Sequence, residues 1–343
     1  MSKLLEAAAD RAFAPVQAVL DDGRIPGAAL GIVTADGARA VRWGGMAMLT
    51  PDRIPLERET LFDLASLTKV MVTVPEVLRL VEDGLVDLDD ALARHLPELC
   101  ADEPNAVART ATLRQLLTHH AGVPALEAIH LWPGDAAALK ERVVRQVWPV
   151  GQKAYSDIGY ILLGLLVERL RGGALADRPV GDGLTFAPDP ACSAATEDCP
   201  WRGRVLRGEV HDENAFALGG AGHAGLFGTV DGVLGFAAAL IEGRVLSAAA
   251  LAEMRSAQTA TRALGWQHRF TVSDIDEPSW AGGSLCAPGT LGHTGFTGTG
   301  LWIDFERGVT WALLTNRVHP SRHTETGIMA LRRTVGNIVT AAT

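Results

Sequence analysis

The order of the hydrophobic patterns along the chain places the strongest limit on its fold. Residues 28–34 and 38–43 alternate as a β-hairpin does, and residues 300–304 and 309–315 form a second pair of apolar strands. Between the two pairs, helical patterns dominate over residues 61–240. Strands near both ends of the chain, separated by helices, predict one sheet built from both ends with a helical lobe inserted between them.

Helical patterns also mark the two termini. The first twenty residues have the periodicity of a helix, and a last helix is expected from about residue 324. Residues 171–208 are rich in Gly, Pro and Asp and lack periodicity, which predicts a long loop. We therefore expect a mixed α/β (α+β) fold class, in which an antiparallel sheet is flanked by N- and C-terminal helices.

The length of the chain allows one large domain with a substantial core. We expect a single catalytic domain over residues 1–343. Its α/β lobe would be formed by residues 1–62 and 241–343, and its helical lobe by residues 63–240. No repeat period is found along the chain.

The composition excludes several classes of partner. A net charge of −9 disfavours nucleic acid and anionic membrane surfaces. No apolar run approaches about 18 residues, so no membrane span is expected. The first residues lack the regions of a signal peptide, which makes a cytoplasmic location the expectation. The partner that remains is a small-molecule substrate, and the oligomeric state is not indicated.

The cysteine and histidine spacings give little support for a metal. Four cysteines show no C-x-x-C spacing, and in a cytoplasmic protein Cys192 and Cys199 are expected to be free thiols. His119 and His120 are adjacent, so their side chains diverge, and the segment 211–213 (His-Asp-Glu) has no partner at ligand spacing. We expect neither a metal nor a cofactor.

Ser66 and Lys69 are the residues that first suggest a chemical function. If their segment is helical, side chains three residues apart share one face, about 5–6 Å apart at Cβ. An unprotonated lysine there can take the proton of a serine that attacks a carbonyl. An isolated pair of this kind is equally compatible with an ordinary helix start that carries an exposed lysine.

The residues after Lys69 favour the catalytic interpretation. An apolar helical stripe runs over residues 70–81 and Gly84 is a plausible end of the helix, so Ser66 lies at the start of a long buried helix. The Ser66 backbone N–H is then an unpaired first-turn donor for an oxyanion. Burial is expected to lower the pKa of Lys69. Pro75 is expected to kink the helix about two turns after the serine.

Two further segments supply groups that a serine–lysine pair needs. Tyr155 precedes a helical stripe over residues 158–166, in a loop from which a phenol can share a proton with an ammonium. The Gly-rich segment 292–300 leads into a strand, where small residues let the backbone approach a carbonyl and offer a second oxyanion donor. Taken singly, a core tyrosine and a Gly-rich turn explain these features as well.

Together these motifs resemble those of the serine β-lactamase and penicillin-binding-protein superfamily, and most closely its class C β-lactamase-like branch of esterases and D-peptidases. The motifs are Ser66-x-x-Lys69, Tyr155-Ser156-Asp157 and His293-Thr294-Gly295, supported by segments 113–119 and 222–227. The resemblance spans roughly residues 15–320. It implies Ser66 as nucleophile, Lys69 and Tyr155 as the proton-transfer pair, and the backbone N–H groups of Ser66 and Phe296 as oxyanion hole.

The same resemblance implies that Asp157, His293, Thr294 and Gly295 bind substrate, and two of these depart from the family pattern. Asp157 replaces an asparagine, so a carboxylate that only accepts hydrogen bonds stands where an amide could donate. His293 replaces a lysine that receives the carboxylate of a β-lactam, and a mostly neutral imidazole binds anions less well. Both changes favour ester or amide hydrolysis over β-lactam hydrolysis.

The leading hypothesis is a serine hydrolase that cleaves small esters or amides through an acyl-enzyme on Ser66, as a carboxylesterase does. The alternatives are a β-lactamase, a D-alanyl-D-alanine carboxypeptidase or D-aminopeptidase, and a non-catalytic protein that kept the fold. The glycines of segment 219–225 are not followed by Gly-Lys-Ser/Thr, which excludes a phosphate-binding loop. No G-x-S-x-G elbow is present, which excludes a conventional α/β-hydrolase.

Overall fold

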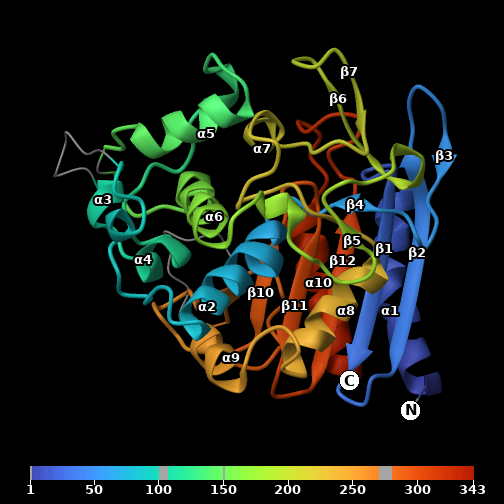
Figure 1. Ribbon diagram of the computed structural model, residues 1–343. Helices are drawn as coiled ribbons and strands as arrows, with labels where there is room; N and C mark the ends of the chain where they lie inside the picture. The colour runs from blue at the N-terminus through green and yellow to red at the C-terminus, as the bar shows by residue number, and fades with distance from the viewer. Residues whose placement is uncertain (1, 100–106, 150, 270–279) are drawn as a thin grey trace.

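The computed structural model describes residues 2–99, 107–149, 151–269 and 280–343 (Figure 1). Within these ranges seven antiparallel strands form the main sheet, and strands from the two ends of the chain meet where β1 pairs with β12. The predicted fold class is thereby confirmed. In spatial order the strands are β3 (Ile54–Pro55), β2 (Arg39–Met48), β1 (Gly27–Thr34), β12 (Val309–Thr315), β11 (Gly300–Asp304), β10 (Leu291–Thr294) and β9 (Gln267–His268).

Helices cover both faces of this sheet. On one face α1 (Ser2–Asp21) packs against α10 (Ile328–Ala342), and their apolar side chains share a core with Trp302 and Trp311, whose rings stack 5.8 Å apart. On the other face α8 (Val230–Ile241) contacts β1 and β12. Alternate residues of each central strand thus point into two separate apolar layers.

Several of the other helices lie beside the sheet (Figure 1). Among them α6 (Asp157–Arg171) is buried over residues 158–167, and Ser156 caps it by accepting a hydrogen bond from the Gly159 N–H. This confirms the predicted stripe. The other helices are α2 (Val74–Glu82), α3 (Val107–Thr110), α4 (Leu113–Leu117), α5 (Ala136–Arg145), α7 (Glu213–Ala217) and α9 (Ala248–Arg255).

The helix after Ser66 differs from the prediction. A π-helical turn, Lys69–Thr73, comes first, and α2 begins only at Val74. Pro75 therefore lies in the first turn of α2, directly after the π-helical turn, and the expected kink two turns after the serine stays a prediction. Gly84 follows the C-cap of α2 with φ +67°, in agreement with the predicted helix end.

The segment 171–208 contains more structure than a loop. It includes β5 (Leu184–Thr185), which joins β4 (Phe62–Asp63) and β8 (Phe227–Gly228), and the hairpin of β6 (Ala195–Cys199) and β7 (Arg204–Arg207). The hairpin has no alternating pattern because Glu197, although charged, is buried beside Arg322. The last helix likewise begins at Ile328 rather than at residue 324, after Gly327 in a left-handed conformation.

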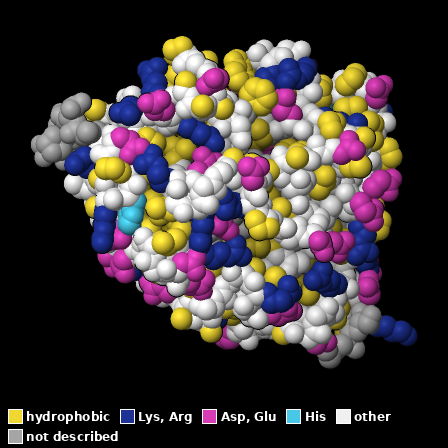
Figure 2. Space-filling view, in the orientation of Figure 1, with side chains coloured by type: hydrophobic (Ala, Val, Ile, Leu, Met, Phe, Trp, Pro, Cys, Tyr) yellow, Lys and Arg dark blue, Asp and Glu magenta, His cyan; other side chains and the backbone are white. Residues whose placement is uncertain are grey.

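The surface agrees with the mixed charge of the sequence. Acidic and basic side chains are interspersed over the face in Figure 2. Of the helices in the described ranges, none is long and apolar enough to span a bilayer. Cys192, Cys199 and Cys286 are free thiols, and Cys100 lies outside the described residues. The division into an α/β lobe and a helical lobe stays a prediction.

Candidate active site

Ser66 lies in a tight turn between β4 and the first helical residue. The preceding residue, Ala65, has φ +47°, a conformation that is rare outside glycine. Buried Asp63 holds this turn, because its carboxylate accepts hydrogen bonds from the N–H groups of Ala65 (2.8 Å) and His211 (2.7 Å). Burial raises the pKa of Asp63. The hydroxyl of Thr68 donates to the Ala65 carbonyl at 2.7 Å, so that the turn is held from both sides.

Lys69 is fully buried and lies between three oxygen atoms. Its Nζ is 2.9 Å from Ser66 Oγ, 2.7 Å from Asp157 Oδ1 and 3.2 Å from the carbonyl oxygen of His223. Burial acts to lower the pKa of Lys69, but the charges of Asp157 and Tyr155 outweigh it, and the net pKa is raised. The expectation of a lowered lysine pKa is therefore wrong. The reason is Asp157, which supplies a negative charge directly beside the ammonium.

Tyr155 lies in the loop before α6, as expected, and His119 supports its ring. The two ring centroids are 4.3 Å apart, and Lys69 Nζ is 4.8 Å from the Tyr155 centroid. His119 Nδ1 accepts the Ser156 N–H at 3.0 Å, which leaves the proton of the neutral ring on Nε2. Burial, followed by the charges of Arg262 and Lys69, holds the pKa of His119 well below its usual range. His119 thus positions the tyrosine without carrying a charge.

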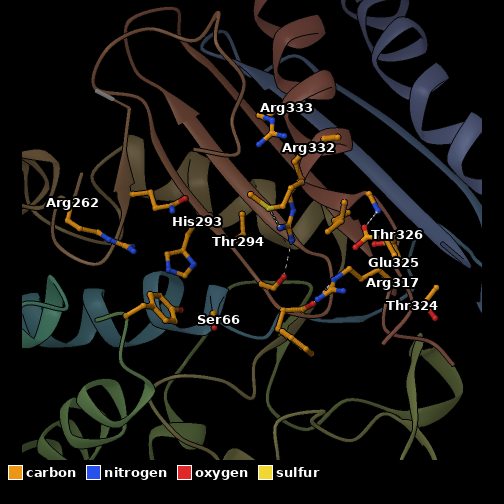
Figure 3. Close-up of a pocket in the computed structure, with 18 residues that line it drawn as sticks. Ser66, Arg262, His293, Thr294, Arg317, Thr324, Glu325, Thr326, Arg332 and Arg333 are labelled. Carbon is orange, nitrogen blue, oxygen red and sulfur yellow. Dashed lines mark hydrogen bonds between the residues drawn. The ribbon is translucent and has the colours of Figure 1, made fainter. Parts of the chain in front are cut away.

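His293 and Thr294 form the end of β10 beside the nucleophile. The His293 side chain is buried, and its ring centroid is 6.1 Å from that of Tyr155. Burial and then the charges of Lys69 and Arg262 keep the pKa of His293 well below its usual range, so the imidazole is neutral at pH 7. Figure 3 shows the guanidinium of Arg262 pointing toward this histidine.

The loop after β10 is joined closely to the residues that precede Ser66. A Cβ on Gly295 would lie 2.6 Å from the Leu64 carbonyl oxygen, so only glycine fits there. The hydroxyls of Thr297 and Thr299 donate to the carbonyl oxygens of Asp63 (2.7 Å) and Leu64 (3.0 Å). These contacts hold the loop at a constant distance from the nucleophile.

Two backbone N–H groups near this junction have no protein acceptor in the described part of the chain. Within the described ranges, neither the Ser66 N–H nor the Phe296 N–H donates to another group of the chain. The Phe296 carbonyl accepts from Arg317 Nε at 2.8 Å, and the Phe296 ring stacks on His211 with centroids 5.6 Å apart. The geometry is compatible with the predicted oxyanion hole, whose role stays a prediction.

A cleft opens at Ser66 and divides into two arms that share Ser66, Tyr155 and Phe296. The first, here called the basic arm, has a volume of about 650 Å³ and runs along His293 and Thr294 toward α10 (Figure 3). Its charged lining residues are Arg262, Arg317, Arg332, Arg333 and Glu325. Arg332 donates to the carbonyl oxygens of Gly295 and Thr299 and so holds the loop, whereas the other arginines add positive charge to the wall.

The second arm, here called the acidic arm, has a volume of about 330 Å³ and lies on the other side of Ser66. Its charged lining residues are Glu127, Asp157, Asp212, Glu213 and Arg322, and His130, His211 and His223 also line it. Among the described residues, the two arms therefore carry opposite charge on either side of Ser66.

Asp157, Asp212 and His223 are the one group in the described ranges whose spacing would suit a metal ion, with donor atoms within 4.8 Å of one another. His223 Nε2 lies 2.8 Å from Asp212 Oδ1. Burial raises the pKa of Asp212, but His223 outweighs this and the net pKa is lowered. Because the Lys69 ammonium is already 2.7 Å from Asp157, a residue of the chain supplies the positive charge that a metal would bring.

Sequence reasoning identified the residues of the short motifs and missed those that support them. Asp63 and Arg262 were not singled out, and His119 and Asp212 were considered only as metal ligands. No local pattern marks Arg262, because it reaches the site from an irregular segment before β9. A carboxylate at the end of a short apolar segment was the available signal for Asp63, which is the last residue of β4.

The fold and this site are those of a serine hydrolase, and comparison with known proteins gives the family. Residues 9–334 match the family model described as Beta-lactamase, and the chain belongs to that family. It is 33% identical over 308 residues to a putative D-alanyl-D-alanine carboxypeptidase of Escherichia coli K12, a match that covers 76% of this chain and 70% of the relative.

Solved structures show the same fold. EstCE1, a hydrolase with promiscuous acyltransferase activity, superposes with a TM-score of 0.71 at 22% identity, covering 97% of this chain and 98% of the other. A class C β-lactamase from Rhodobacter sphaeroides superposes with a TM-score of 0.69 at 20% identity, covering 96% and 99%. The resemblance found in the motifs is thereby confirmed.

Proposed function

We propose that the chain hydrolyses small amides or esters through an acyl-enzyme on Ser66, and that it prefers substrates whose leaving half carries a carboxylate. The observation that carries the first part is the 2.9 Å contact between Lys69 Nζ and Ser66 Oγ at the junction of two cleft arms. In the reaction Ser66 Oγ forms a bond to the substrate carbonyl carbon, and the C–N or C–O bond to the leaving group breaks. Water then releases the acyl group.

The proton of Ser66 passes to Tyr155 in this proposal. A protonated lysine has no lone pair, so Lys69 acts as an ammonium that stabilises an ionised Tyr155. Tyr155 lines both arms at Ser66 and returns the proton to the leaving group. The N–H groups of Ser66 and Phe296 would hold the carbonyl oxygen as it becomes an anion.

The preference for a carboxylate rests on the basic arm. Among the described residues, Arg262, Arg317 and Arg333 line it together with the carboxylate of Glu325. Guanidinium groups bind carboxylates in a planar, charge-assisted geometry. They supply the positive charge that neutral His293 does not. A short peptide with a free carboxyl end has this chemistry, as does the substrate that the name of the Escherichia coli relative indicates.

Carboxylesterase-like hydrolysis is the second candidate, and neutral His293 is the observation that favours it. A neutral imidazole at this position imposes no charge on the substrate. Penicillin-type lactams are a third substrate type for the same nucleophile. Hydrolysis of D-alanyl-D-alanine, p-nitrophenyl butyrate and a chromogenic cephalosporin, measured side by side as kcat/KM, separates the three.

The acyl-enzyme is tested with a fluorophosphonate, which modifies activated serines. Mass spectrometry should show one adduct, on the peptide that contains Ser66, and Ser66→Ala should abolish both the adduct and hydrolysis. Ser156→Ala is a matched control, because Ser156 caps α6 near the site and is expected to remain unmodified. An adduct on another serine, or an active Ser66→Ala enzyme, would overturn the proposal.

A further inference from the structure

The acidic arm has no role in the function proposed so far, although it opens directly at the nucleophile. Four carboxylates line it, from Glu127, Asp157, Asp212 and Glu213, and the cations that contact them are Arg322 and Lys69. Arg322 also pairs with Glu197, which lies outside the arm, so its charge is shared. Negative charge therefore exceeds positive charge in the arm.

The charge of the Glu127 carboxylate is the least compensated by neighbouring cations. Glu127 is exposed at the arm, and in the described part of the chain no cationic side chain pairs with its carboxylate. Its backbone carbonyl is held by Asn214 Nδ2 at 2.8 Å, so the residue is anchored beside α7. An exposed carboxylate at the wall of a cavity, on a backbone that is held in place, is suited to meet a cation that arrives with the substrate.

His223 adds an independent observation. Its side chain is fully buried and lines the arm, and its Nε2 is 2.8 Å from Asp212 Oδ1. A carboxylate only accepts hydrogen bonds, so Nε2 carries a proton. Among the described residues Nδ1 has no partner. A buried ring nitrogen without a partner, in an arm lined mainly by carboxylates, suits a polar group of a ligand.

We propose that the acidic arm binds a protonated amine on the acyl half of the substrate. This inference rests on the proposed acyl transfer at Ser66 and adds the chemistry of the acyl group. With a carboxylate in the basic arm and an ammonium in the acidic arm, the substrate is a short peptide with both ends free. An unblocked dipeptide has this arrangement, because its single amide bond lies between the two charges. The arm's volume of about 330 Å³ accommodates an amino-acid-sized group.

The test measures protection of Ser66 against the fluorophosphonate, so that it does not depend on turnover. Three competitors are compared: D-alanyl-D-alanine, its N-acetyl form and its N,N-dimethyl form. Acetylation removes the positive charge, whereas dimethylation adds bulk and keeps it. The free and dimethyl peptides should protect Ser66 at about tenfold lower concentration than the acetyl peptide. This difference in affinity corresponds to about one charge-assisted hydrogen bond.

Two variants assign the effect to the arm. The ratio to compare is the protecting concentration of the acetyl peptide divided by that of the free peptide. Glu127→Gln should reduce this ratio by about threefold or more, because one carboxylate is lost. Glu59→Gln, an exposed glutamate outside both arms, should leave the ratio unchanged. Equal protection by the acetyl peptide, or loss of protection on dimethylation, would overturn the inference. So would the absence of protection by the free peptide at about 20 mM, above the range of weak ligands. A failure to label Ser66 would instead refute the acyl-enzyme itself.

Discussion

At the scale of single residues, Asp157 decides the protonation state of Lys69. Its carboxylate lies 2.7 Å from the ammonium, and its charge contributes to the raised pKa of Lys69 despite complete burial. The motif spacing predicts that the serine and lysine meet, because three residues span one helical turn. It does not predict the carboxylate, which comes from a helix about ninety residues further along the chain.

Replacing Asp157 by Asn tests this role of the carboxylate. Removing the negative charge should lower the pKa of Lys69, so the ammonium is lost at a lower pH. If the ammonium is the active form, the alkaline limb of the kcat/KM profile should move to lower pH in Asp157→Asn. Profiles of the two proteins from about pH 5 to 11 check this. An alkaline limb that stays in place would show that the charge on Lys69 is not required.

Lys69 and Tyr155 should act as one unit. Lys69→Ala and Tyr155→Phe should each lower kcat by about 10²–10⁴, the usual effect of losing a positioned proton-transfer group. The double variant should have a kcat little lower than that of the less active single variant, because each residue needs the other for the same step. Single-turnover acylation rates of all four proteins measure this. Losses that multiply in full would mean that the two residues serve different steps.

At the scale of elements, the site depends on the junction between the turn at Ser66 and the loop after β10. The strand β10 and the hairpin of β11 and β12 follow from alternation and turn residues, and the predicted bounds of β11 and β12 agree with the structure. The π-helical turn after Ser66 could not be predicted, since its side-chain pattern is that of any buried helix. The hairpin β6–β7 was missed because Glu197 is buried through a distant ion pair.

Gly295→Ala tests the junction. The added Cβ would meet the Leu64 carbonyl at 2.6 Å, and a backbone atom cannot rotate away as a side chain can. We expect β10 and the Phe296 N–H to move, which should lower kcat by about 10²–10³, the effect of losing one oxyanion donor. The free energy of unfolding should fall by about 1–3 kcal/mol from overpacking. Activity measured alongside thermal unfolding checks both, and Gly235→Ala, where space is open, is the control.

At the scale of the whole molecule, the fold separates charges of opposite sign around Ser66. The chain carries a net charge of −9, yet arginines gather in the basic arm and carboxylates in the acidic arm. These residues come from widely separated segments, so the total charge says nothing of the site. The expectation of ester or amide substrates rested on Asp157 and His293, before the arginines of the basic arm were known.

Arg333→Gln tests the basic arm. It should raise KM for D-alanyl-D-alanine by about three- to tenfold, because a partly exposed charge is lost from the wall. The KM of an uncharged p-nitrophenyl ester should change less, since it has no carboxylate to bind. Arg53→Gln removes an exposed arginine away from the cleft and should change neither. A larger effect on the ester than on the dipeptide would contradict a carboxylate site.

The sequence by itself determined what depends on near neighbours along the chain. Strand alternation, helix stripes and the three-residue step from Ser66 to Lys69 are local, and they were enough to place the sheet and the candidate nucleophile. Only the tertiary structure decided which charges surround that nucleophile. Asp157, Asp212 and Arg262 meet there because the sheet brings distant segments together, and the strength of a charge interaction depends on distance and burial, which no sequence pattern records.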